Sequence, residues 1–224
     1  MIIGGIAVII LAAGSSSRMS GIKKEFYKLE TGISVLGTST LTFASVPQID
    51  TVVIVVQEGN ESAAREALPP ALLANPRLKI KFVTGGTSRR ASVFNALSSL
   101  ENSSHDYILI HDGARPWVSS SLVEAIIEAV IKHNAVIPLL PITDTPKEYD
   151  GQFVKNHLKR ACVGTAQTPQ AFKFTQILEA HKKAAEVSED FTDDAEIWGR
   201  FIGQVACIPG EPENKKITFN EDLH

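Results

Sequence analysis

The chain has 224 residues, of which 44% are hydrophobic and 21% are charged, and its formal net charge is −3 at pH 7. A chain of this length buries a sizeable core, and one domain or at most two are expected. Because the charge balance is slightly negative, the composition gives no support for binding to nucleic acid or to an acidic membrane surface.

The first predicted element is a strand at residues 6–11, within an apolar run from Ile2 to Ala13. The alternative is a signal peptide, because the small residues after this run resemble a cleavage site. However, only Met1 precedes the run, whereas a signal peptide begins with a basic stretch. The run is also too short to cross a bilayer. We therefore expect a buried strand and no association with a membrane.

Short apolar runs rich in β-branched residues then alternate with helical segments. Such runs are typical of parallel strands that are covered on both faces. Strands are predicted at residues 6–11, 51–56, 80–83, 107–111 and 135–141, with an edge strand within 201–210. Helices are predicted at residues 34–46, 61–68, 92–100, 121–133 and about 175–186, with Ser121 and Glu124 as a capping box for the fourth. This alternation predicts an α/β fold with a mostly parallel sheet.

The pattern changes at residues 142–165, where the long helices stop and a partial alternation appears in "GQFVKNHLKRACV". We expect short strands here, in an excursion from the main sheet. No internal repeat or long linker divides the chain. The prediction is therefore a single domain over residues 1–224 that contains this excursion.

The two cysteines, Cys162 and Cys207, are isolated in the sequence. They form no CxxC pair, and no histidine lies at the spacing of a metal site, so neither a zinc site nor a disulfide framework is supported. A reducing, cytoplasmic location is expected.

The first strand ends in a small, polar turn, "AAGSSSR", closed by Arg18. Open α/β sheets bind ligands at the carboxyl ends of their strands, and small residues let backbone N–H groups approach an anion. The segment is neither a Walker loop nor a dinucleotide fingerprint. On its own it is equally compatible with a phosphate cradle and with a flexible turn that carries a surface arginine.

Three further segments carry polar groups of the same kind. Lys23 and Lys24 follow Arg18, "TGGTSRRASV" follows the strand at 80–83, and "HDGARP" contains Asp112 at the end of the strand at 107–111. Separately, each has an ordinary explanation: a solvated lysine pair, a glycine turn with a serine helix cap, and a turn-capping aspartate. Together they indicate a site for a triphosphate and Mg²⁺.

Eight motifs then occur in a characteristic order: "LAAGSSSRM", "KKEF", "GGTSRRASVFNAL", "HDGARP", "DTPK", "RACVGTAQTPQAF", "TDDA" and "NKKIT". From Ile6 to Leu223 the chain resembles the 2-C-methyl-D-erythritol 4-phosphate cytidylyltransferase family, which serves the non-mevalonate route to isoprenoid precursors. The resemblance implies a Rossmann-like, three-layer α/β/α nucleotidyltransferase fold. It also implies a reaction in which CTP and methylerythritol phosphate give 4-diphosphocytidyl-2-C-methyl-D-erythritol and pyrophosphate, with Mg²⁺ as the divalent cation. A homodimer is implied, with residues 142–165 as an arm that embraces the partner.

The resemblance also implies roles for individual residues. The expected catalytic residues are Arg18, Lys24 and Lys216. The expected CTP-binding residues are Ala12, Ala13, Gly14, Gly85, Ser92 and Asp112, and Asp112 is also the candidate metal residue, mainly through the phosphates of CTP. The expected methylerythritol phosphate-binding residues are Arg115, Thr145, Arg160, Thr192 and Lys216, with Arg160 serving the partner's site.

Within this resemblance, either Lys23 or Lys24 could be the catalytic lysine, and the following Glu25-Phe26 favours Lys24. Glu25 itself stands where the family usually has glutamine.

Two other functions stay open. A cytidylyltransferase for ribitol 5-phosphate or another polyol phosphate would share most of the motifs, although "SVFNAL" and "DTPK" favour methylerythritol phosphate. A nucleotide-binding module without catalysis is a different class, and the presence of Arg18, Lys24, Asp112 and Lys216 argues against it.

Overall fold

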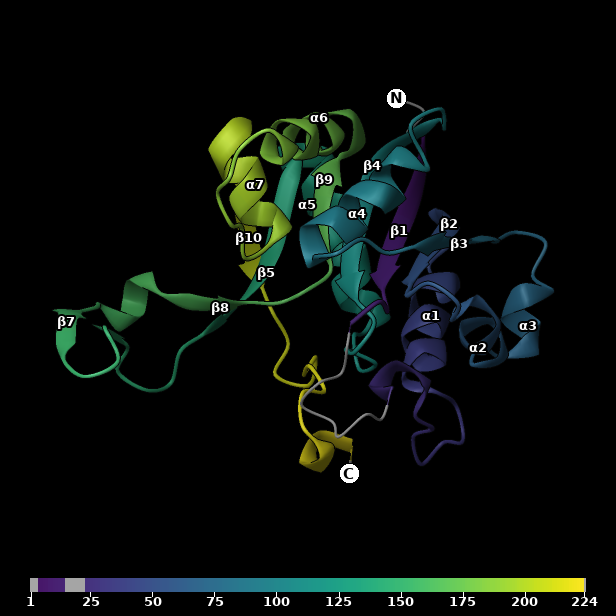
Figure 1. Cartoon of the computed structure of the whole chain (residues 1–224), viewed down its shortest axis with the longest axis horizontal. Coiled ribbons are helices and arrows are strands. Elements are labelled where there is room, and N and C mark those ends of the chain that lie inside the picture. The colour runs from purple at the N-terminus through teal and green to yellow at the C-terminus, as the bar shows by residue number, and fades with distance from the viewer. Residues whose placement is uncertain (1–3, 15–22, 224) are drawn as a thin grey trace.

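A mixed sheet runs through the molecule in the computed structural model, which describes residues 4–14 and 23–223 (Figure 1). Its strands are β1 (Gly5–Leu11), β2 (Ile49–Val56), β3 (Lys79–Thr84), β4 (His105–Asp112), β5 (Ala135–Pro141), β8 (Gly164–Ala166), β9 (Gln170–Lys173) and β10 (Ala206–Pro209). Over the described residues the sheet has eight strands in the order β10-β5-β9-β4-β1-β2-β3, with β8 beside β5. The short strands β8 and β9 pair antiparallel with their neighbours, and the other pairings are parallel. The predicted mostly parallel sheet is confirmed.

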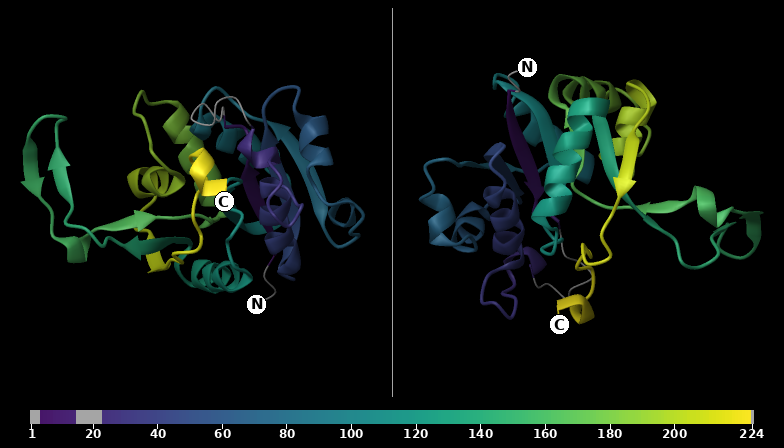
Figure 2. Two further views of the ribbon diagram at one scale, coloured as in Figure 1. Left: turned by 90° about the horizontal axis from the view of Figure 1, so that it is seen from below. Right: turned by 180° about the vertical axis from the view of Figure 1, so that it is seen from behind.

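Helices cover both faces of this sheet, as Figures 1 and 2 show. They are α1 (Val35–Ser45), α2 (Glu61–Glu66), α3 (Pro70–Leu73), α4 (Arg89–Ser98), α5 (Ser120–His133), α6 (Phe174–Ala185) and α7 (Asp194–Phe201). Strand β1 explains the layering, because Val8 and Ile10 pack into one core with α1 and α5, whereas Ala7 and Ile9 pack into a second core with α4, α6 and α7. Alternate side chains of a strand point to opposite faces, so an all-apolar strand needs cover on both. The three-layer α/β/α fold is confirmed.

Several details differ from the sequence-based prediction. The capping box at Ser121 and Glu124 is wrong, because α5 begins one residue earlier and Ser119 Oγ accepts the Leu122 N–H at 3.0 Å. Strand β9 and helix α7 were not predicted at all. β9 has only four residues, and its sequence "QAFK" lacks the β-branched side chains by which the longer strands were recognised.

Residues 142–165 leave the sheet and form an exposed arm that projects from the body of the molecule (Figures 1 and 2). The arm carries an antiparallel hairpin of β6 (Lys147–Tyr149) and β7 (Val154–His157), followed by a 3-10 turn, η3 (Arg160–Cys162). Large apolar side chains are exposed on it, with Tyr149 at 70% and Phe153 at 66% of their full accessibility. The predicted excursion of short strands is therefore confirmed.

No helix in the described part of the chain combines the length and the apolar character needed to cross a membrane.

Candidate active site

A cleft of about 720 Å³ opens at the carboxyl ends of β1 to β4. This is where an open α/β sheet binds its ligands, because loops and helix N-termini meet there. The predicted site residues that line it are Ala13, Gly14, Lys24, Gly85, Ser92, Asp112 and Lys216. Ala12 is buried beside it, and its N–H donates to Val55 O at 2.8 Å. Arg18 lies outside the described residues.

The wall after β3 is built from two glycines and a serine. A Cβ atom at Gly85 would lie 2.7 Å from Ala13 Cβ and 2.9 Å from Ser92 Oγ, so a side chain there would push the two walls of the cleft apart. The Gly86 N–H donates to Ser92 Oγ at 3.0 Å, and Ser92 is buried in the first turn of α4. The serine that caps this helix is Ser88, whose Oγ accepts the Ala91 N–H at 3.1 Å, and not Ser92. Ser92 instead fixes the glycine turn.

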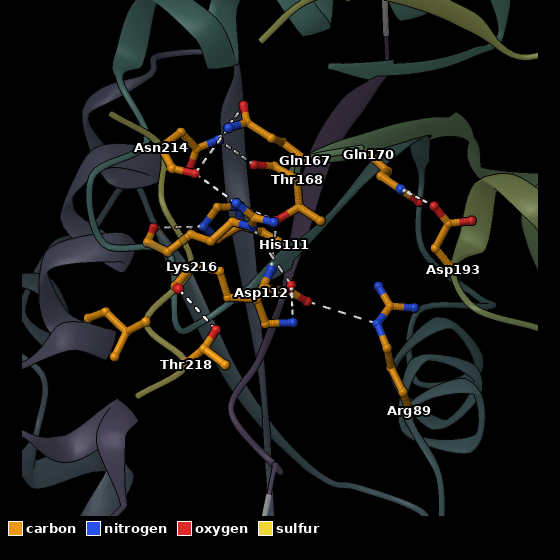
Figure 3. A network of polar contacts seen from close by, with 12 residues as sticks. Arg89, His111, Asp112, Gln167, Thr168, Gln170, Asp193, Asn214, Lys216 and Thr218 are labelled. Atoms are coloured by element: carbon orange, nitrogen blue, oxygen red, sulfur yellow. Dashed lines mark hydrogen bonds and ion pairs between the residues drawn. The ribbon is translucent and has the colours of Figure 1, made fainter. Parts of the chain in front are cut away.

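Asp112, at the end of β4, is surrounded by cations (Figure 3). Its Oδ2 lies 2.7 Å from Lys216 Nζ and 3.8 Å from Arg115 Nε, and its Oδ1 lies 3.9 Å from Arg89 Nε. Burial opposes ionisation of this carboxyl, but the charges of Lys216, Arg89 and Arg115 outweigh it and hold the pKa well below its usual range. Asp112 is therefore an ionised carboxylate with three positive side chains around it, of which Lys216 and Arg89 line the cleft.

Lys24 reaches the same cleft from the 3-10 turn η2 (Lys24–Phe26). It is 8% exposed, and its ammonium group donates to Ile217 O at 2.9 Å, next to Lys216 in the chain. Lys23 does not itself line the cleft, although its ammonium group donates to two lining residues, to Gly14 O at 3.3 Å and to Gln57 Oε1. Of the two lysines, the geometry favours Lys24 as the one that faces a ligand.

The segment that carries Lys216 is held by polar contacts that the sequence did not reveal (Figure 3). Asn214 is fully buried, and its Nδ2 donates to Thr168 O at 2.8 Å. Arg115 Nη1 donates to Asn214 O at 2.7 Å, and Gln167 Nε2 donates to Glu211 O at 2.8 Å. The sequence showed "RACVGTAQTPQAF" and "NKKIT" as two motifs of the family, but not that their polar residues contact one another. Arg115 therefore supports the C-terminal segment as well as Asp112.

His111, the residue before Asp112, is wholly buried. Its Nε2 lies 3.1 Å from Arg115 O, which can only accept, so Nε2 carries the proton. Its Nδ1 then accepts from the hydroxyl of Thr168 at 3.1 Å, and that oxygen accepts the Asp112 N–H at 3.0 Å. Burial is the main reason why the pKa of His111 falls to about 4. The neutral ring thus fixes the backbone on both sides of Asp112.

This pKa predicts an acid-sensitive stability. The folded pKa of His111, about 4, lies below the unfolded value of about 6.5, so the unfolded chain binds the proton first as the pH falls. The contribution of His111 to the free energy of unfolding is complete above about pH 6.5 and is lost toward pH 4, in total roughly 3 kcal/mol. Urea unfolding of wild type and His111→Gln should show this loss in wild type alone. Parallel pH dependences in the two proteins would contradict the assignment.

Of the five residues expected to bind methylerythritol phosphate, Lys216 lines the cleft, whereas Arg115 lies 3.8 Å from Asp112 without lining it and the other three lie elsewhere on the chain. Thr145 and Arg160 are exposed on the arm, where Arg160 Nη1 donates to Thr143 O at 2.8 Å. Thr192 is exposed before α7, and its hydroxyl donates to Glu196 Oε2 at 2.8 Å. A single chain thus brings the expected nucleotide-binding residues together, whereas Thr145, Arg160 and Thr192 lie away from its cleft.

The carboxylates that line the cleft are Glu25, Glu58 and Asp112. Among the described residues no group of three or more His, Cys, Asp or Glu side chains is arranged to hold a metal ion. Mg²⁺ commonly binds through one or two carboxylates together with the phosphates of a substrate. Asp112 fits that role, because Lys216 lies close to one of its oxygens while Arg89 Nε is 3.9 Å from the other.

The chain is similar to known proteins in both sequence and structure. The model of the family IspD, 2-C-methyl-D-erythritol 4-phosphate cytidylyltransferase, matches residues 6–224. The bifunctional enzyme IspD/IspF of Bartonella tribocorum is 36% identical over 221 residues, which cover 97% of this chain and 54% of that protein. The bifunctional enzyme IspD/IspF of Solidesulfovibrio magneticus is 38% identical over 222 residues, covering 96% and 54%. The chain thus spans about half the length of these curated relatives.

Solved structures agree with the sequence relatives. The 4-diphosphocytidyl-2C-methyl-D-erythritol synthase of Anaerococcus prevotii superposes with a TM-score of 0.85 at 32% identity, covering 98% of this chain and 92% of that one. The 2-C-methyl-D-erythritol 4-phosphate cytidylyltransferase of Thermus thermophilus gives a TM-score of 0.76 at 30% identity, covering 98% and 95%.

Proposed function

Because this chain belongs to the 2-C-methyl-D-erythritol 4-phosphate cytidylyltransferase family, we propose that it transfers a cytidylyl group from CTP to 2-C-methyl-D-erythritol 4-phosphate. The products are 4-diphosphocytidyl-2-C-methyl-D-erythritol and pyrophosphate, in the non-mevalonate route to isoprenoid precursors. The observation that carries the proposal is the single cleft in which Lys24, Lys216 and Asp112 meet the glycine turns after β1 and β3.

The proposed reaction is an in-line displacement at the α-phosphorus of CTP. A phosphate oxygen of methylerythritol phosphate forms the new P–O bond, and the bond from the α-phosphorus to the bridging oxygen breaks, so that pyrophosphate leaves with the electron pair. Charge accumulates on the phosphate oxygens, and the protein contributes positioning and neutralisation. Lys24 and Lys216 supply two cations in the same cleft, and Arg18 is proposed as the third.

The small residues of the cleft are proposed to hold the nucleotide. Ala12, Ala13 and Gly14 after β1 and Gly85 after β3 have small side chains or none, and a compact wall of this kind favours a pyrimidine over a larger purine. Ser92 keeps the turn at Gly86 in place.

Asp112 is proposed to hold Lys216 until the substrate arrives and then to bind Mg²⁺ that is carried by the triphosphate. Bound there, the ion would neutralise phosphate oxygens as a Lewis acid. Lys216 is 40% exposed at its side chain, so its ammonium group is free to move from Asp112 to a phosphate oxygen.

Pyrophosphate release tests the proposed substrates. Wild type should release pyrophosphate from CTP with methylerythritol phosphate, and much less with ATP or GTP in place of CTP. Release with ribitol 5-phosphate in place of methylerythritol phosphate would favour the polyol phosphate alternative. Binding of CTP without release in either case would favour a nucleotide-binding module and contradict catalysis.

We also propose that two chains form a homodimer through the arm. Besides Tyr149 and Phe153, Val154 is 52% and Leu158 38% exposed on the arm, an apolar surface that a second copy would cover. Arg160 and Thr145 would then reach the partner's cleft, which accounts for their absence from the cleft of their own chain. The guanidinium group of Arg160 gives one N–H to Thr143 O and keeps further donors for a phosphate.

Mixed dimers test this shared site. We expect Arg160→Ala and Lys24→Ala chains to be nearly inactive separately and to regain activity when they form heterodimers. In each heterodimer one site receives Lys24 from one chain and Arg160 from the other, so half of its sites are wild type. If heterodimers form, as native mass spectrometry would show, and activity does not return, Arg160 serves its own chain.

A cytoplasmic location is proposed from the cysteines. Cys162 and Cys207 are both free and exposed, which suits a reducing compartment.

A further inference from the structure

Arg89, the first residue of α4, lies on the wall of the cleft between two carboxylates. Its Nη2 is 2.8 Å from Asp194 Oδ2, and its Nε is 3.9 Å from Asp112 Oδ1. The side chain is 33% exposed, whereas that of Asp194 is fully buried. One end of the guanidinium group is thus fixed inside the protein and the other faces the cleft.

Asp194 is a carboxylate in an enclosed position, at the start of α7 and outside the cleft lining. Its Oδ1 lies 3.1 Å from Nε2 of His181 on α6, and the side chain of His181 is also fully buried. Burial opposes ionisation of Asp194, but Arg89 and His181 outweigh it and lower its pKa. A buried carboxylate is costly unless it is paired in this way, and removal of its partner leaves an uncompensated charge.

Arg90 shows that the position of Arg89 is specific. It is the next residue in α4, yet its guanidinium group donates to Ala184 O at the end of α6 and does not line the cleft. The two neighbouring arginines therefore make different contacts. Arg90 connects α4 to α6, and Arg89 connects the cleft wall to Asp194 on α7.

We propose that Asp194 is a positioning residue that holds Arg89 at the cleft wall beside Asp112, and that His181 holds Asp194 in turn. A fixed Arg89 shares the charge of Asp112 with Lys216, so Lys216 leaves that carboxylate more readily for a phosphate oxygen. Without Asp194, the guanidinium group has Asp112 as its remaining carboxylate and moves into space that the triphosphate needs. The functional part of this inference rests on the proposed function.

A double-mutant cycle tests the coupling. Asp194→Asn keeps the shape of the side chain and removes its charge, and we expect the KM for CTP to rise about tenfold, the loss that one charge-assisted contact typically gives. Arg89→Gln should have a similar effect, and the double variant should be no worse than Arg89→Gln alone, because both changes remove one contact. The matched control, Arg90→Gln, should leave the KM for CTP unchanged. Effects of Asp194→Asn and Arg89→Gln that multiply in the double variant would indicate a separate structural role for Asp194 and overturn the proposal.

A second measurement keeps the inference independent of turnover. In ligand-free protein with ¹⁵N-labelled arginine, the Nη2–H signals of Arg89, assigned with Arg89→Lys, should be protected from exchange in wild type, because Nη2 lies 2.8 Å from Asp194 Oδ2, and lost in Asp194→Asn. The Arg90 signal should persist in both. An unchanged Arg89 signal in Asp194→Asn overturns the proposed anchoring. If wild type shows no turnover, the proposed function is wrong. The NMR measurement would still show whether Asp194 holds Arg89 in place.

Discussion

Lys216→Ala is expected to lower kcat for cytidylyl transfer by about 10²-fold or more, with a smaller loss of CTP binding. The ammonium group lies 2.7 Å from Asp112 at the mouth of the cleft, where charge on the α-phosphate and the leaving pyrophosphate would develop. A positive group that is already in place acts mainly on the transition state, because little reorganisation is needed when the charge appears. Steady-state kinetics together with calorimetry of CTP binding separate the two effects.

Lys215 provides the matched control for Lys216. It is adjacent in the chain, exposed, and absent from the cleft lining. Lys215→Ala should therefore keep wild-type kcat, and equal losses in the two variants would mean that the segment as a whole, rather than Lys216, determines the rate.

Lys24→Ala is the second large effect that we expect, again about 10²-fold or more in kcat. Lys24 is almost fully buried, lines the cleft and contacts Ile217 O at 2.9 Å, so its ammonium group is held beside the segment that carries Lys216. Lys23→Ala removes the neighbouring charge and its contact with Gly14 O, and its kcat should fall far less. Thermal unfolding of both variants checks that the fold is retained.

The opposite ranking of these two variants would be informative. If Lys24→Ala turns over normally and Lys23→Ala is inactive, the lysine turn has been assigned one residue out of register.

The sheet could be predicted from the sequence because its central strands are buried on both faces. β1, β2 and β4 are continuous apolar runs, and their predicted bounds differ from the observed ones by at most two residues. β9 could not be predicted, because its place between β4 and β5 depends on contacts distant in the chain, such as Leu109 with Ala171. The capping residue of α5 was misplaced because Ser119, Ser120 and Ser121 are equally good candidates in sequence.

Much of the candidate site could also be predicted, because its residues follow strands directly. The segments that carry Gly85, Ser92 and Asp112 were found from their position after a strand, and the nucleotide-binding role of these residues came from the resemblance to the family. The contacts of Asp194 with Arg89 and of Asn214 with Thr168 could not be found, because they are tertiary contacts that local patterns do not encode. The role of Arg160 is a different case, since its proposed site belongs to a second chain.

The most direct test of the central claim follows the α-phosphorus of CTP. The enzyme would be incubated with CTP labelled at the α-phosphate and with methylerythritol phosphate, and the labelled product identified by chromatography and mass spectrometry. Cytidylyl transfer predicts the label in 4-diphosphocytidyl-2-C-methyl-D-erythritol, with one unlabelled pyrophosphate for each labelled product. Label in free CMP or CDP, or label that stays in CTP, would contradict the proposed reaction.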